Sequence, residues 1–105
     1  MTTFDKREEA FEQHFAHDEE LRFKATARRN KLLGLWAAEK LGLADATANS
    51  YALSIVMSEI EGAHDVAGKI RKDFEAKGIA QSDHQIARMM TELMEKAVAD
   101  IKAGK

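Results

Sequence analysis

Apolar residues recur at helical spacing along this chain, and no proline interrupts them. No segment of useful length alternates apolar and polar residues, which would indicate a strand. Since 45% of the 105 residues are hydrophobic and 32% are charged, the composition suits one folded domain near the lower size limit for a self-sufficient core. We predict an all-α fold, a small bundle of about four helices with a mobile N-terminal arm.

Glycines and capping residues divide the helical pattern into segments. We expect the first firm helix to begin at the N-cap Asp18 and to end near Gly42, with a core-facing stripe of Leu21, Ala25, Leu32, Leu35, Trp36 and Leu41. The next helix is expected to be capped by Asp45 and closed by Gly62, with its apolar stripe made of Leu53, Val56, Met57 and Ile60.

Two further helices complete the expected bundle. One spans about Asp65 to Lys77, on Val66, Ile70 and Phe74, and ends at a glycine stop, Gly78-Ile79. The last follows a capping box, in which Ser82 is the N-cap and Gln85 the third helical residue, and its apolar face is Ile86, Met90, Leu93, Ala97 and Ile101. The methionines Met57, Met89, Met90 and Met94 could form a deformable partner surface, but we favour core packing.

Residues 1–17 have too thin an apolar face to be a stable helix alone. Phe4, Glu8, Phe11 and Phe15 share one helical stripe, and their neighbours add little apolar area. Because isolated helices of this length lose most of their helicity in water, we expect residues 1–17 to be a mobile arm and residues 18–105 to be the helical bundle.

The charge of the chain is divided at the end of this arm. Residues 1–20 carry seven acids and two bases, a balance of −5, and residues 21–31, here called the basic segment, carry +5 with no acid. The formal net charge of −2 gives no general attraction for nucleic acid or acidic membranes. The start of the chain has no apolar signal region and no apolar run is long enough to cross a membrane, so we expect a cytoplasmic protein that is monomeric when free.

No arrangement of residues indicates catalysis. Without cysteine there is no thiol nucleophile or Cys-ligated metal, and no phosphate-binding glycine loop or nucleophile elbow is present. His14, His17 and Asp18 have the spacing of metal ligands on a helix, but we favour exposed, unligated side chains, with a pH-dependent change of arm charge as a hypothesis. We therefore expect neither an enzyme nor a metal site, and no required cofactor.

The basic segment offers an alternative function. Its cations, Arg22, Lys24, Arg28, Arg29 and Lys31, could contact phosphates. For an adenine nucleotide we assign Arg28, Arg29 and Lys31 to the phosphates and Trp36 to stacking on the base, which would give weak ATP or ADP binding. The competing interpretation, which we favour, places Trp36 in the core and the basic residues on a solvated face.

Three stretches resemble one protein family closely. They are FDKREEAFE (Phe4 to Glu12), FAHDEELRFK (Phe15 to Lys24) and ARRNKLLGLWAA (Ala27 to Ala38), and residues 66–79 and 84–86 also agree. They resemble the zeta subunit, the natural inhibitor of the F-type ATP synthase in alphaproteobacteria, long catalogued as a domain of unknown function. The similarity spans nearly the whole chain and is ungapped over its first forty residues.

The resemblance implies a four-helix fold with an inhibitory N-terminal segment. That segment, mobile when free, would become helical on entering a catalytic α/β interface of the ATPase head, beside the central stalk, and would block rotation in the hydrolytic direction. It corresponds here to roughly Thr2 to His17, with contacts assigned to Phe4, Asp5, Arg7, Glu8, Phe11 and Phe15. The protein would then lie peripheral to the inner membrane when bound. A nucleotide sensor and a generic helical interaction module are the alternatives.

Overall fold

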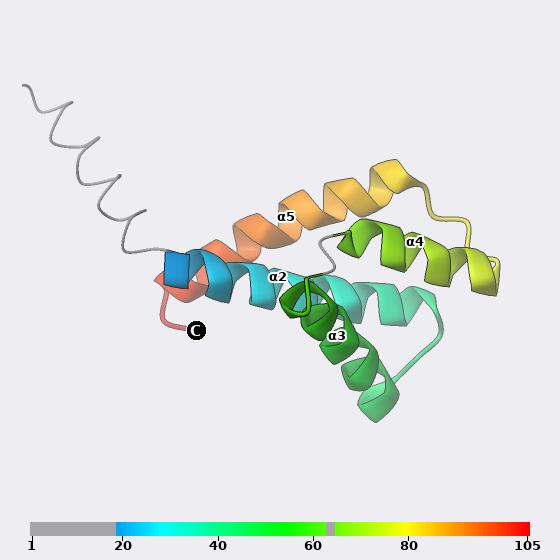
Figure 1. Cartoon of the computed structure of the whole chain (residues 1–105), viewed down its shortest axis with the longest axis horizontal. Coiled ribbons are helices and arrows are strands. Elements are labelled where there is room, and N and C mark those ends of the chain that lie inside the picture. The colour runs from blue at the N-terminus through cyan, green and yellow to red at the C-terminus, as the bar shows by residue number, and fades with distance from the viewer. Residues whose placement is uncertain (1–18, 63–64) are drawn as a thin grey trace, which may run out of the picture.

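The computed structural model describes residues 19–62 and 65–105. They form four helices, α2 (Glu19–Lys40), α3 (Asp45–Ile60), α4 (Val66–Lys77) and α5 (Asp83–Lys102) (Figure 1). No strand occurs in these two stretches, and the all-α prediction is confirmed. The predicted arm, residues 1–17, and the predicted N-cap Asp18 lie outside the described residues.

Helix α2 is the central element. It packs along α3 on one side and along α5 on the other, while α4 contacts α5, α2 and α3 (Figure 1). Helix α5 runs back along α2, so the C-terminus lies beside the first turns of α2 (Figure 1). No helix among the described residues is both long enough and apolar enough to span a membrane.

The core lies where the four helices meet. Leu33, Ile55, Ile70, Phe74 and Ile86 are fully buried there, one or more from each helix. The indole ring of Trp36 packs edge-on against the ring of Phe74, with 5.8 Å between centroids and 71° between planes. The predicted core residues of α4, Val66, Ile70 and Phe74, are all buried, and so are Ile86 and Ala97 of α5.

The predicted ends of α4 and α5 are confirmed. Gly78 follows α4 with a left-handed φ of 69°, and the Ile79 amide donates to the Phe74 carbonyl at 2.8 Å. The capping box of α5 is complete, with the Gln85 amide donating to Ser82 Oγ at 3.1 Å and the Ser82 amide donating to Gln85 Oε1 at 3.2 Å.

The predicted cap of α3 is wrong. The N-cap is Ala44, which makes no side-chain cap hydrogen bond, and Asp45 is the first helical residue. An N-cap needs extended backbone, and Ala44 has it (φ −144°, ψ 159°), whereas Asp45 has a left-handed φ of 52°.

The predicted core face of α2 is confirmed only in part, by Ala25 and by Trp36 and Leu41, which pack against the core. Of its six residues only Ala25 is fully buried, and Leu21, Leu32, Leu35, Trp36 and Leu41 are partly buried. The fully buried residues are Ala25, Asn30, Leu33, Gly34, Ala37 and Ala38. The cause is a close crossing with α3, since a Cβ added at Gly34 would lie 2.6 Å from the Cα of Ala52. Small residues, not the large apolar ones, set the contact.

The same crossing turns the apolar stripe of α3 outward. Ala52 and Ile55 are the buried residues of α3, whereas Leu53, Met57 and Ile60 are 59%, 43% and 51% exposed. The predicted core stripe of α3 is therefore wrong for these three, and Val56 is partly buried. Core packing is wrong for Met57, whereas Met89 and Met90 pack against the core and Met94 is partly buried.

Candidate functional site

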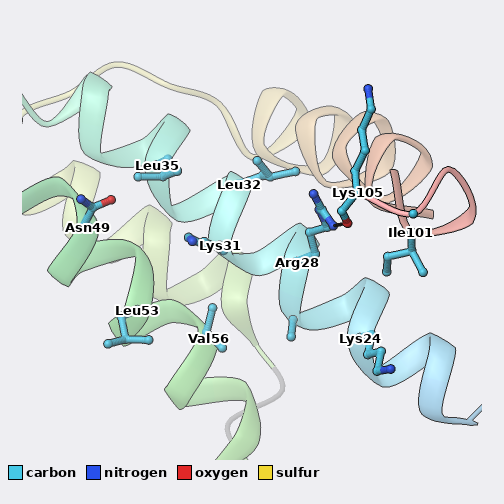
Figure 2. Close-up of a pocket in the computed structure, with 12 residues that line it drawn as sticks. Lys24, Arg28, Lys31, Leu32, Leu35, Asn49, Leu53, Val56, Ile101 and Lys105 are labelled. Atoms are coloured by element: carbon cyan, nitrogen blue, oxygen red, sulfur yellow. Dashed lines mark hydrogen bonds between the residues drawn. The ribbon is translucent and has the colours of Figure 1, made fainter. Parts of the chain in front are cut away.

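A groove with cations around an apolar floor lies between α2, α3 and the C-terminus. It has a volume of about 1020 Å³ (Figure 2). Its floor and walls include Leu32, Leu35, Leu53, Val56 and Ile101, and its cations are Lys24, Arg28, Lys31 and Lys105. We call it the cationic groove. Such a combination suits a ligand with an apolar part and an anionic part.

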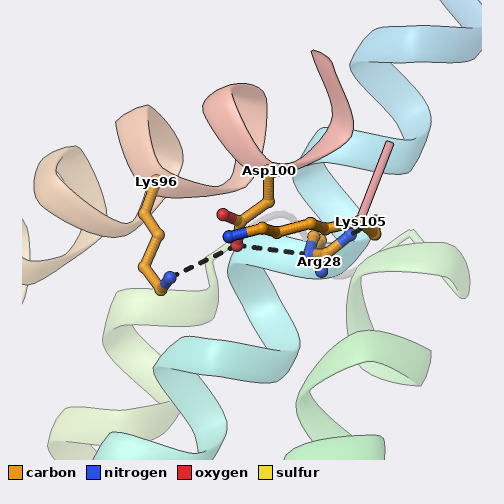
Figure 3. A network of polar contacts seen from close by, with 4 residues as sticks. All are labelled: Arg28, Lys96, Asp100 and Lys105. Atoms are coloured by element: carbon orange, nitrogen blue, oxygen red, sulfur yellow. Dashed lines mark hydrogen bonds and ion pairs between the residues drawn. The ribbon is translucent and has the colours of Figure 1, made fainter. Parts of the chain in front are cut away.

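Ion pairs from α5 hold one of these cations in place. Arg28 Nε lies 3.7 Å from Asp100 Oδ2, and Lys96 Nζ lies 3.3 Å from the same oxygen (Figure 3). The Arg28 guanidinium also donates to the carbonyl of Lys105. The Asp100 side chain is only 15% exposed, so water screens its ion pair with Arg28 less than it would at the surface. Together the contacts with Asp100 and Lys105 hold the Arg28 side chain in place and join the C-terminus to α2.

The structure brings together two of the four residues predicted for nucleotide binding. Arg28 and Lys31 line the cationic groove. Arg29 instead lies beside Met90 and Met94, where burial lowers its pKa and the Glu59 carboxylate partly opposes that shift. Trp36 packs against Phe74 in the core.

Two further cations line the groove. Lys24 belongs to the basic segment expected to contact phosphates, and it precedes Arg28 by four residues and Lys31 by seven and so shares their helical face. Lys105 carries no such signal, because only the return of α5 along α2 brings it to Arg28.

A second hollow lies between the first half of α2 and the last turns of α3, and it shares Ala27 and Val56 with the cationic groove. It has a volume of about 390 Å³, and we call it the α2–α3 cleft. Phe23 and Ile60, 59% and 51% exposed, line it together with Val56. Its wall also includes Asn30, which is fully buried and whose Oδ1 accepts from Arg29 Nε at 3.1 Å. The Asn30 Nδ2 donor has no hydrogen-bond partner in the structure as described.

The residues assigned to partner contact lie outside the described residues. These are Phe4, Asp5, Arg7, Glu8, Phe11 and Phe15, and the same holds for His14, His17 and Asp18. In the sequence they directly precede α2, whose first residue, Glu19, lines the α2–α3 cleft.

Comparison with known proteins gives one informative result. A search of curated proteins returns no match. The family model described as ATPase inhibitor subunit zeta matches residues 1–100, which confirms the resemblance found in the sequence. This family consists of inhibitory subunits that regulate an ATPase, and the match covers all four helices to within two residues of the end of α5. The chain therefore belongs to the family of the ATPase inhibitor subunit zeta, and is a regulatory protein rather than an enzyme.

Proposed function

We propose that this protein inhibits ATP hydrolysis by the F-type ATP synthase by inserting residues 1–17, as a helix, into a catalytic α/β interface of the head. Inserted there, the arm blocks rotation in the hydrolytic direction. The observation that carries the proposal is that the family match begins at residue 1, so that it includes the arm as well as the bundle.

The composition of the arm fits this role. Phe4, Phe11 and Phe15 fall on one helical face, and burial of each is worth roughly 1.5–3 kcal/mol before the cost of ordering the chain. The acidic residues and Arg7 set the register and polarity of the contact. A thin helix that folds on binding can enter a cleft that is closed to a globular domain.

The arrangement of the described helices supports separate roles for the two parts of the chain, with the arm inserting and the bundle staying folded outside. Among the described residues the four helices build a core of their own, which includes Leu33, Ile55, Ile70, Phe74 and Ile86. The bundle can therefore remain folded outside the interface and limit how far the arm enters. A protein bound in this way is peripheral to the inner membrane, in contact with the head and its central stalk.

Photo-crosslinking tests where the arm binds. A photoreactive residue placed at Phe11 of the full-length chain is expected to crosslink to both α and β subunits at a catalytic interface. The same group placed at Lys72, which is exposed on α4, should give no such adduct. If adducts from position 11 form only with the outer surface of the head or with the chain itself, the insertion mechanism is wrong.

A second candidate function is weak binding of an adenine nucleotide. The supporting observation is the cationic groove, in which Lys24, Arg28 and Lys31 follow one face of α2 beside an apolar floor. A base would lie over Leu53 and Val56 and the phosphates would meet the cations. Occupancy of the groove would then follow the cellular concentration of ATP or ADP, and the inhibitor would respond to the energy state of the cell.

Titration with ATP, followed by backbone amide shifts, tests this candidate. We expect shifts around Lys24, Arg28 and Lys31, and affinity reduced several-fold by Lys31→Ala but not by the matched change Lys72→Ala on α4, since each neutralises one exposed lysine. Unchanged amides along α2 at millimolar ATP would rule the groove out as a nucleotide site.

A further inference from the structure

We infer that the α2–α3 cleft is a second docking surface for the ATPase head, one that receives an apolar side chain of the head next to a backbone carbonyl or carboxylate oxygen. The inference rests on the proposed function. It assigns to the bundle specific binding contacts with the head, in addition to limiting how far the arm enters.

The apolar character of the cleft is the first argument. Phe23 and Ile60 expose more than half of their surface on adjacent helices, and they line one hollow together with Val56. Large apolar side chains that gather around a hollow, rather than lying singly on the surface, are typical of protein docking sites.

A buried hydrogen-bond donor in the wall is the second argument. The orientation of the Asn30 amide follows from its neighbour, because Arg29 Nε can only donate and so requires Oδ1 on its side. This leaves Nδ2 without a partner on a residue that is fully buried and lines the cleft. Buried amide donors are seldom left unpaired, so an occupant that offers an acceptor oxygen is favoured.

The position of the cleft identifies the occupant. Glu19, the first residue of α2, lines the cleft, and Phe23 follows Phe15 by eight residues. Eight residues span at most about 28 Å even when fully extended. A head that holds the arm as far as Phe15 therefore lies within reach of Phe23 and Ile60, and no other part of the described surface is so directly connected to the arm.

The charged residues of the cleft restrict the contact further. Glu19, Arg22 and Glu59 line it, so that both signs of charge surround the apolar centre. A rim of mixed sign gives no general attraction to a strongly charged surface. The specific complement is an apolar side chain with a neighbouring acceptor, not an acidic or a basic patch.

Two exposed substitutions and one matched control test the inference in the full-length chain. Phe23→Ser and Ile60→Ser are each expected to weaken binding to the head about 10- to 30-fold, because hot-spot residues lose binding energy of that order when truncated. Inhibition at saturation should be retained, since the arm is intact. Met57→Ser is the control: Met57 is a large apolar residue, 43% exposed, that shares α3 with Ile60 but lines neither the α2–α3 cleft nor the cationic groove. It should bind like the wild type.

Several results would overturn the inference. The cleft is not a docking surface if Phe23→Ser and Ile60→Ser both bind the head with wild-type affinity. In that case the proposed function would still stand, provided that a chain lacking residues 2–17 fails to inhibit. Tighter binding by Phe23→Ser would show that the chain's own arm covers the cleft. Self-association of the wild type that Phe23→Ser abolishes would assign the cleft to a second copy of the chain.

Discussion

Replacement of Gly34 by valine is expected to destabilise the bundle by about 3 kcal/mol, the upper part of the usual range for overpacking. A Cβ at this position would lie 2.6 Å from the Cα of Ala52 and 3.1 Å from its Cβ. The obstacle is backbone, which cannot rotate away as the end of a flexible side chain can, so α3 must move away from α2. Such a loss is a large share of the 5–15 kcal/mol that stabilises a typical domain.

Urea unfolding of the two chains measures this effect. Ala87→Val is the control. It introduces the same β-branched side chain into a helix, but at an exposed position of α5. It should change the free energy of unfolding by only a few tenths of a kcal/mol. If Gly34→Val is as stable as this control, the close crossing of α2 and α3 is wrong.

This crossing also shows what the sequence could not predict. Periodicity identifies a stripe on a helix but not the neighbour that covers it, and it gives most weight to large apolar residues. The contact between α2 and α3 is instead set by Gly34 and Ala52. As a result the prediction put Leu53, Met57 and Ile60 in the core, although they are exposed.

Helices α4 and α5 were predicted well for a complementary reason. Their ends are fixed by local interactions, the left-handed Gly78 and the capping box of Ser82 and Gln85, which depend only on neighbouring residues. Their core faces carry large residues such as Phe74 and Ile86, which are buried as the periodicity predicts.

The candidate grooves could be predicted only in part. The charge division of the sequence identified Arg28 and Lys31, because it is a property of consecutive residues. It could not find Lys105, which lies 77 residues from Arg28. The favoured placement of Trp36 in the core is confirmed by its contact with Phe74. The α2–α3 cleft joins residues about 35 positions apart and becomes visible only once α3 is packed on α2.

Removal of residues 2–17 is expected to abolish inhibition while leaving the bundle folded. The arm carries three phenylalanines as apolar anchors. Two of them, at about 1.5 kcal/mol of burial free energy each, supply about 3 kcal/mol of binding free energy. Losing that amount lowers the affinity more than hundredfold. Among the described residues the core runs from Ala25 to Ala97 and draws on all four helices, so we expect the bundle to fold without the deleted segment. The melting temperature should therefore change little.

A matched chain separates the sequence of the arm from its length. Residues 2–17 are replaced by sixteen alternating glycines and serines, which retain the tether but remove every apolar anchor and charge. If the side chains of the arm make the contact, this chain should fail to inhibit just as the deleted chain does. Inhibition by the glycine–serine chain would mean that an attached tether alone obstructs rotation.

The most direct measurement is ATP hydrolysis by the isolated synthase head, titrated with the full-length chain, the chain lacking residues 2–17 and the glycine–serine chain. The proposed mechanism predicts inhibition by the full-length chain, and none by either altered chain at a hundredfold higher concentration, with all three bundles folded. Inhibition of equal strength by the chain lacking residues 2–17 would contradict it and transfer the inhibitory role to the bundle.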